Sequence, residues 1–376
     1  MSDVPHLRFP EFTGEWKKYR LDEMGESFIG LTYSPKDVVE NEGTIVFRSS
    51  NIQNGQIDYS DIVRVSKTIK ERIITRENDL LICARNGSPR LIGKNALIKK
   101  TDANNTFGAF MMVYRSIDND FIHPLLSTRR YVSQVGENLG ARINQITTSD
   151  LNSFEFFFPK NDGEKRKIGK LFDLLNERIA TQNKIIEDLK KLKSAIYHKQ
   201  FSNLQGKEKT LFELAEIIKG QQINGSELSE SGKFYVMNGG IVPSGYYDCY
   251  NTEADTISIS EGGNSCGYVQ YNNSKFWSGG HCYTLRIKPT APIATQFLFH
   301  FLKWKEADIM ALRIGSGLPN IQKKDLSKIC IIVPTLDRQQ QQIALLTTFQ
   351  MKIENEGRYV VNLDKQKQYL LQQMFI

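Results

Sequence analysis

Residues 164–200 read EKRKIGKLFDLLNERIATQNKIIEDLKKLKSAIYHKQ, with no proline and one glycine. The apolar residues of this stretch recur at steps of three and four, the spacing of one face of a helix. At 1.5 Å per residue, about 37 residues form a rod roughly 55 Å long. A helix of this length exceeds the usual range in globular proteins and needs a partner along its length. We therefore expect a long helix over 162–200 and a second one to pack against it.

The chain supplies this partner between residues 337 and 375, where the same apolar periodicity returns. Each stretch follows a proline, Pro159 or Pro334, and begins with an aspartate, Asp162 or Asp337, that we expect to cap its helix. We predict that the two helices pair as an antiparallel coiled coil. The residues expected to form the seam are Ile168, Leu175, Ile179, Ile186, Leu189, Ile196, Ile343, Ile353, Val360, Leu363 and Leu370.

The two stretches are parts of an internal duplication. Pro159 matches Pro334 and Ile168 matches Ile343 at an offset of 175, and Phe201 matches Phe375 at an offset of 174. Short apolar runs bounded by Gly, Asn, Asp or Pro, such as 44–47, 79–84 and 110–114, predict strands. We therefore expect a mixed α/β (α+β) fold with pseudo-two-fold internal symmetry. The expected parts are a globular domain over 1–158, a helix over 159–206, a second globular domain over 207–333 and a helix over 334–376.

Composition indicates a globular protein with a basic surplus. Hydrophobic residues make up 40% and the formal net charge is +7, and residues 164–200 hold ten Lys or Arg against five Asp or Glu. Such a surplus suits a polyanion, although exposed helices also carry lysine for solubility. The first residues do not resemble a signal peptide, there is no run of 18 apolar residues, and the five cysteines form no C-x-x-C pair. We expect a cytoplasmic protein with reduced thiols and no membrane span.

The catalytic and metal motifs that we sought are missing or incomplete. None of the 11 prolines is adjacent to another, which excludes the Pro-Pro signature of amino-methyltransferases. Gly87–Asn95 is similar to a phosphate loop, but it has one residue too many between its glycines and Asn in place of the magnesium-binding Ser or Thr. His281, Cys282 and Cys266 lack the second ligand pair of a structural zinc site. We expect no catalytic residue, metal or cofactor in this chain.

The ordered duplication resembles the specificity subunit of type I restriction–modification systems. The resemblance covers essentially the whole chain and is most telling over Asn144–Leu151, Pro159 and the helix that follows, a sequence of features repeated from Asn320 to Phe375. Residues 5–12 before Trp16 also resemble the opening of many members. The family usually has a Glu-Gln pair early in each helix, where this chain has Glu164-Lys165 and Gln339-Gln340.

The resemblance implies a division of labour within a larger complex. Each globular part would be a target-recognition domain that reads one half of a bipartite double-stranded DNA target. The helices would set the spacer and dock two modification subunits, which carry S-adenosylmethionine and the adenine-methylating site. Restriction subunits would add translocation and cleavage driven by ATP with Mg. This chain would be the non-catalytic subunit that decides where the others act.

The residues that contact bases are expected in polar turns after strands, where arginine can reach guanine and Asn or Gln can reach adenine. The same residues could equally be ordinary turn or surface residues. Our candidates for DNA binding are Arg48, Ser49, Asn51, Arg85, Asn86 and Arg90 in the first domain and Asn238, Tyr246, Glu261, Asn264 and Arg313 in the second.

Two other interpretations stay open at this point. A non-catalytic adhesion protein could display two ligand-binding heads on a coiled coil. A self-contained nuclease or methyltransferase is disfavoured by the missing motifs.

Overall fold

The computed structural model describes residues 4–139, 144–315, 317 and 319–376. The chain divides into two compact units, and each of the two long helices contributes to both. Unit 1 comprises Met1–Gln182 with Tyr359–Ile376, and unit 2 comprises Asn183–Arg358.

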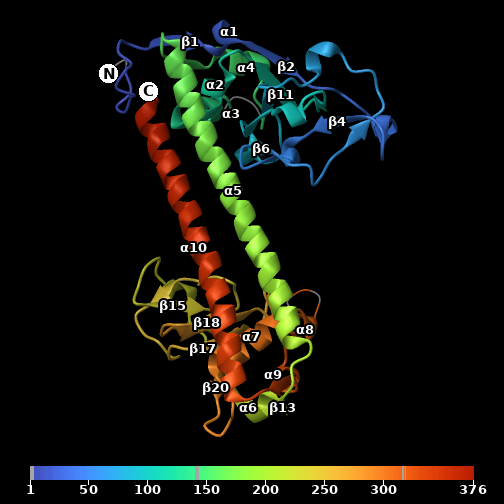
Figure 1. Cartoon of the computed structure of the whole chain (residues 1–376), viewed down its shortest axis with the longest axis vertical. Coiled ribbons are helices and arrows are strands. Elements are labelled where there is room, and N and C mark those ends of the chain that lie inside the picture. The colour runs from blue at the N-terminus through green and yellow to red at the C-terminus, as the bar shows by residue number, and fades with distance from the viewer. Residues whose placement is uncertain (1–3, 140–143, 316, 318) are drawn as a thin grey trace. The chain divides into compact units, whose positions relative to one another are not determined.

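Unit 1 is built around an antiparallel four-stranded sheet in the order β2-β11-β8-β9, beside a second sheet in the order β10-β4-β7-β3 (Figure 1). The expected strands over 44–47, 79–84 and 110–114 correspond to β4, β8 and β11. Its strands are β1 Lys17–Arg20, β2 Glu26–Ile29, β3 Val38–Val39, β4 Thr44–Phe47, β5 Ile52–Gln53, β6 Gln56–Ile57, β7 Arg64–Val65, β8 Leu80–Cys83, β9 Asn95–Leu97, β10 Thr106–Phe107, β11 Met111–Arg115 and β12 Glu155–Phe158. Its helices are α1 Leu21–Met24, α2 Asn119–Leu125, α3 Arg129–Leu139, α4 Thr148–Ser153 and the first half of α5 Asp162–Phe201.

Unit 2 repeats this topology. The sheet β14-β20-β17-β18 corresponds to β2-β11-β8-β9, the parallel pair β15–β19 to β4–β10, and the antiparallel pair β13–β21 to β1–β12. Its strands are β13 Lys207–Thr210, β14 Ala215–Lys219, β15 Phe234–Met237, β16 Tyr246–Tyr247, β17 Thr256–Ser260, β18 Val269–Asn272, β19 Trp277–Ser278, β20 Cys282–Ile287 and β21 Cys330–Val333. Its helices are α6 Leu211–Leu214, α7 Thr295–Trp304, α8 Glu306–Ala311, α9 Lys323–Leu326 and the first part of α10 Leu336–Met374. The predicted mixed α/β fold with an internal duplication is confirmed.

The end of α10 completes the hydrophobic core of unit 1. Phe375, the residue after α10, lies with its ring centroid 5.7 Å from Phe172 of α5, 5.4 Å from Phe121 of α2 and 6.3 Å from Trp16. Leu371 and Met374 belong to the same buried cluster. The core of the first globular fold is therefore closed by the last residues of the chain.

The end of α5 plays the same part in unit 2. The ring of Phe201, the residue matched to Phe375, lies 5.5 Å from Phe301 of α7 and 5.5 Å from Trp304. Ile343 and Leu346 of α10 lie in the same buried cluster. Each globular fold thus buries the aromatic residue at the end of one long helix, Phe201 in α5 or Phe375 just after α10.

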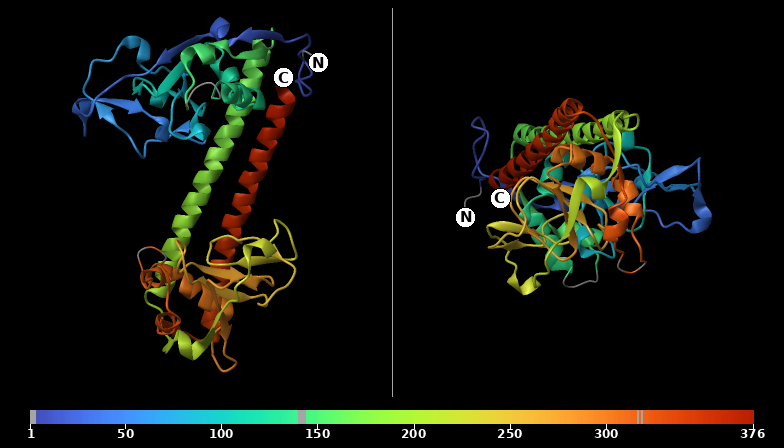
Figure 2. Two further views of the ribbon diagram at one scale, coloured as in Figure 1. Left: turned by 180° about the vertical axis from the view of Figure 1, so that it is seen from behind. Right: turned by 90° about the horizontal axis from the view of Figure 1, so that it is seen from below.

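The two helices run antiparallel within each unit (Figures 1 and 2). In unit 1, Arg178 of α5 donates a 3.4 Å hydrogen bond to Tyr359 of α10. In unit 2, Lys193 lies at hydrogen-bond distance from Gln350, and Gln342 donates to the carbonyl oxygen of Gln200 at 3.3 Å. The partner number on α10 falls as the number on α5 rises, which is the mark of an antiparallel pair.

The eleven seam residues differ in burial. Ile168, Ile343 and Leu363 are buried, and the other eight are half-buried. Leu175 and Leu370 pack against the core of unit 1, and Ile196 packs against that of unit 2. Direct packing of the remaining five against one another stays a prediction. These are Ile179, Ile186, Leu189, Ile353 and Val360.

The N-caps differ from the expected aspartates. Asn161, one residue before α5, accepts a 2.7 Å hydrogen bond from the amide of Gly163 through its side chain. At α10, the hydroxyl of Thr335 accepts from the amide of Arg338 at 3.5 Å. Asp162 and Asp337 instead lie in the first turns, where a carboxylate still interacts favourably with the helix dipole.

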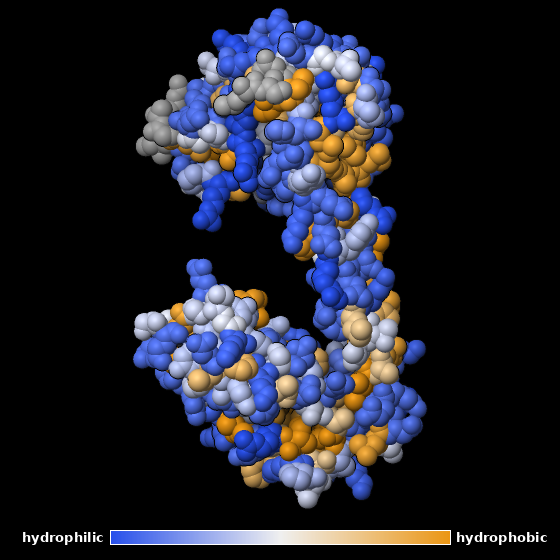
Figure 3. Space-filling model, turned by 90° about the vertical axis from the view of Figure 1, so that its left-hand side faces the viewer, coloured by the Kyte–Doolittle hydropathy of each residue, from blue (hydrophilic) through white to orange (hydrophobic). Residues whose placement is uncertain are grey.

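Polar side chains cover most of the face shown in Figure 3, with scattered apolar patches between them. No helix among the described residues is both long and apolar enough to cross a membrane.

Replacing Phe375 with alanine tests whether α10 closes the core of unit 1. We expect a loss of about 3–5 kcal/mol, typical of a buried phenylalanine, in the opening free energy of strands β8 and β11. Peptide-resolved hydrogen exchange measures this free energy segment by segment. Tyr369→Ala, a change at a residue of α10 that is 60% exposed, should alter it by about 0.5 kcal/mol or less. Loss of protection confined to residues 359–376, with β8 and β11 unchanged, would contradict this assignment.

Candidate nucleic-acid interface

Four of the residues proposed for DNA binding meet at one cavity of unit 1, with a volume of about 590 Å³. Arg85 and Asn86 follow the buried strand β8, and Arg48 and Ser49 follow β4. The start of β11 supplies the opposite wall. The full lining is Leu31, Thr32, Tyr33, Arg48, Ser49, Ser50, Asp61, Arg85, Asn86, Gly108, Ala109, Phe110 and Met111.

The two arginines of this cavity differ in their partners. Arg48 donates a 2.7 Å charge-assisted hydrogen bond to Asp61, so its charge is largely neutralised. Arg85 is exposed, and its guanidinium carbon lies 5.2 Å from the ring centroid of Phe110. Within the described part of the chain, no carboxylate lies within ion-pair distance of Arg85. Its N–H groups are therefore available to a ligand.

Asn86 and Asn51 lie close together but have different roles. The Asn86 side chain donates to the Ser49 hydroxyl at 2.9 Å, which holds the two loops together. Asn51 is fully buried, accepts from the amide of Arg48 at 2.8 Å and donates to the carbonyl oxygens of Asp58 and Asp61. Asn51 is therefore corrected from a base-contacting residue to one that shapes the loop, because a buried, fully bonded amide cannot reach a base.

Arg90 is exposed on the short helix Pro89–Leu91 and does not line the cavity.

Unit 2 has a cavity of about 510 Å³ at the equivalent place. Asn238 follows β15 as Arg48 follows β4, whereas the strand register places Glu261 where unit 1 has Ala84 and Gly262 where it has Arg85. The match extends to the backbone, because the amide of Ala84 donates to the carbonyl oxygen of Phe110 at 3.0 Å and the amide of Glu261 donates to that of His281 at 2.9 Å. The full lining is Lys219, Asn238, Gly239, Gly240, Ser244, Glu261, Gly262, Gly263, His281, Pro319 and Asn320.

Glu261 gives this second cavity an acceptor where the first has a donor. Its Oε1 accepts from Lys219 Nζ at 2.7 Å and from the Tyr283 hydroxyl at 2.9 Å. Burial, together with the hydrogen bond to Glu261, raises the pKa of Tyr283, so this hydroxyl stays protonated and donates. The Oε2 atom is buried and has no hydrogen-bond partner among the described residues. The two cavities share a position but present different chemistry.

The remaining candidates of unit 2 lie outside this cavity. Tyr246, Asn264 and Arg313 are all exposed, and none of them lines it.

Phe110, His281, Lys219 and Asp61 line the cavities but were not among the candidates from sequence. Gly108–Arg115 and Gly279–Arg286 are matching segments, and their third positions hold Phe110 and His281. The sequence contains no comparable signal for the other two.

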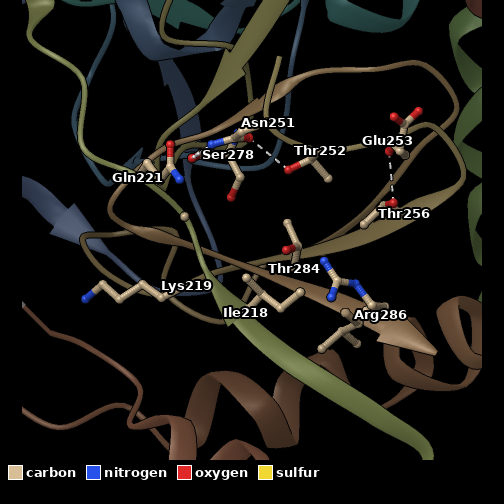
Figure 4. Close-up of a pocket in the computed structure, with 12 residues that line it drawn as sticks. Ile218, Lys219, Gln221, Asn251, Thr252, Glu253, Thr256, Ser278, Thr284 and Arg286 are labelled. Atoms are coloured by element: carbon tan, nitrogen blue, oxygen red, sulfur yellow. Dashed lines mark hydrogen bonds between the residues drawn. The ribbon is translucent and has the colours of Figure 1, made fainter. Parts of the chain in front are cut away.

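Unit 2 has another cavity of about 360 Å³, and Figure 4 shows its lining. Some of its polar groups bond one another, while the buried hydroxyl of Ser278 has no hydrogen-bond partner among the described residues. Asn251 donates to the carbonyl oxygen of Ser278 at 3.0 Å and accepts from Thr252 at 2.9 Å, and Thr256 donates to the carbonyl oxygen of Glu253. None of the residues proposed from sequence lines it, and Lys219 and Arg286 extend in different directions (Figure 4). We therefore regard it as a structural feature of the sheet.

The residues of the rejected zinc motif do not form a ligand set, and Cys266 and Cys282 belong to different buried clusters. Cys266 and Cys282 are buried, and burial raises the pKa of Cys282 to about 11, which opposes the thiolate that zinc requires. The described residues include no group of three or more His, Cys, Asp or Glu that could hold a metal ion.

Comparison with known proteins gives a consistent family assignment. The family model for the type I restriction modification DNA specificity domain matches residues 13–191 and again residues 205–361. A putative type I specificity subunit of Mycoplasma pneumoniae is 34% identical over 155 residues, which cover 41% of this chain and 41% of that protein. The specificity subunit of the type I restriction enzyme EcoKI from Escherichia coli is 23% identical over 390 residues, covering 89% of this chain and 83% of that protein.

Solved structures agree on the fold. The crystal structure of a type I restriction–modification S subunit from M. genitalium superposes with a TM-score of 0.70 at 22% identity, covering 99% of each chain. The alignment to the M. pneumoniae relative spans less than half of that protein's length.

Proposed function

This chain belongs to the type I restriction–modification DNA specificity family, and we propose that each of its units reads one half of a bipartite DNA target. The observation that carries the proposal is the pair of cavities at equivalent places. A protein that recognises two different half-sites with two copies of one fold needs the same backbone arrangement twice and different side chains on each copy. Arg85 and Glu261 meet this need, because arginine donates to guanine and glutamate accepts from the amino group of cytosine.

We propose roles for the other candidate residues according to their places. Arg48, Ser49, Asn86 and Asn238 line the cavities and would contact bases or hold the contacting loops. Arg90, Tyr246, Asn264 and Arg313 are exposed outside the cavities and would contact the phosphate backbone or neighbouring bases. The net charge of +7 supports a polyanionic ligand.

The two long helices would serve the rest of the complex. We propose that they set the unread spacer and dock two modification subunits, which use S-adenosylmethionine to methylate adenine. Restriction subunits using ATP with Mg would join the same assembly in the cytoplasm. This chain would contribute recognition and no catalytic group.

Replacing Arg85 tests base reading by unit 1. The complex of this chain with its modification subunits is incubated with a pool of random duplexes, and the bound duplexes are sequenced. Wild-type protein should enrich two separated base groups. Arg85→Ala should cost about 1–3 kcal/mol of discrimination within one group and leave the other intact, because only one cavity loses its donor.

Arg72→Ala is the matched control, since Arg72 is also exposed in unit 1 but does not line the cavity. An equal loss on every duplex in the Arg85 variant would identify a phosphate contact and overturn the assignment of base reading. Methylation or cleavage of DNA by the purified chain would overturn its non-catalytic role.

Lengthening the helices tests the spacer. Four residues inserted into each of α5 and α10 at facing positions add about 6 Å, on the order of two base pairs of B-DNA rise. The selected spacer should lengthen while both base groups stay the same. Changed base groups with an unchanged spacer would refute the role of the helices as a ruler.

A further inference from the structure

Phe110 and His281 occupy equivalent positions in the two cavities. Each lies immediately before a strand of the central sheet, β11 or β20, and each follows two small residues. Each also accepts, through its carbonyl oxygen, the backbone amide of a charged residue, Arg85 in unit 1 and, one position earlier in the repeat, Glu261 in unit 2. The fold therefore holds a ring beside a charged side chain twice, with a different pair each time.

The Phe110 side chain is exposed and is not part of the hydrophobic core. This side chain is 60% exposed although the residues after Phe110 in β11 are buried. The guanidinium of Arg85 lies over this ring, 5.2 Å from its centroid. A stacked guanidinium keeps its N–H donors free at its edge and loses little rotamer freedom when it binds. The ring thus holds Arg85 ready for a hydrogen-bond acceptor.

His281 lies beside the carboxylate in unit 2. Its side chain is 62% exposed, and its Nδ1 atom is 4.0 Å from Oε2 of Glu261. That distance is too long for a hydrogen bond, and Oε2 is the oxygen with no partner among the described residues. A buried acceptor without a partner is costly, so the site favours a ligand that donates to it.

We infer that Phe110 and His281 are specificity-determining residues, each reading bases together with its charged neighbour. This inference rests on the proposed function and adds two contacts to it. The Phe110 ring contacts a thymine methyl group beside the guanine that Arg85 reads, since aromatic rings suit that methyl. The His281 imidazole moves aside as Glu261 Oε2 accepts from a cytosine amino group, and then contacts the neighbouring base. Both ligands are base edges of duplex DNA.

The test uses the complex with its modification subunits and sequenced selection from random duplexes, with Phe110→Ala and His281→Ala. Phe110→Ala should reduce discrimination on the order of ten-fold within the base group that depends on Arg85 and leave the other group unchanged. His281→Ala should do the reverse. Phe110→Tyr retains a ring and should restore the preference, which separates a ring contact from a folding defect.

Phe212→Ala is the matched control. Phe212 is 66% exposed and has Lys288 4.5 Å from its ring centroid, but it lies on α6 and lines neither cavity. It should leave both base groups unchanged. If Phe110→Ala and His281→Ala bind as this control does, or lose affinity equally for all duplexes, the inference is overturned while the proposed function stands. If the wild-type complex selects no two-part sequence, the proposed function itself fails.

Discussion

Burial of one terminal aromatic residue in each globular core is the constraint on which the rest of this structure depends. Helices of 40 and 39 residues with many charged positions are not held by propensity alone and need packing at their ends. Phe375 supplies this packing in unit 1 and Phe201 in unit 2. Since Phe375 follows α10 and packs against Trp16, Phe121 and Phe172, the core of unit 1 joins segments that are far apart in the sequence.

This arrangement explains how two copies of one fold can differ in chemistry. The face of the central sheet that packs in the main core stays apolar in both copies, with Leu80 and Ile82 in β8 and Ile257 and Ile259 in β17. The other face differs, because β17 carries the buried Ser258 and Ser260 there. The residues just beyond those strands can differ, so Phe110 in one copy is His281 in the other. The charged side chain beside each ring comes from neighbouring positions of the repeat, Arg85 in unit 1 and Glu261 in unit 2. A buried polar side chain near the start of each long helix is also present in both copies. Glu164 bonds Arg8 at the start of α5, and the matched Gln339 bonds the amide of Ala294 beside α10. The two copies therefore share a backbone arrangement, while their surface side chains differ.

Features with a strong periodic signal were predictable from the sequence. Both long helices lie within one residue of the periodic stretches 162–200 and 337–375, because a long three- and four-residue repeat has few alternative structures. Features that depend on exposure were not predictable. Asn51 was expected to contact bases and is buried, while Phe110 is exposed, and neither outcome can be read from residue type. The region 220–245 is mostly loop, but it contains β15, whose pairing with β19 is a long-range contact. The caps Asn161 and Thr335 were missed because an aspartate stood close by in each case.

The central claim is that two chemically different surfaces on a duplicated frame read two separate groups of bases. Methylation profiling of genomic DNA from cells that carry this chain with its modification subunits measures this most directly. The account predicts modified adenines in one motif of two unlike base groups separated by a fixed number of unspecified positions. A single uninterrupted motif, or two identical half-sites, would contradict it.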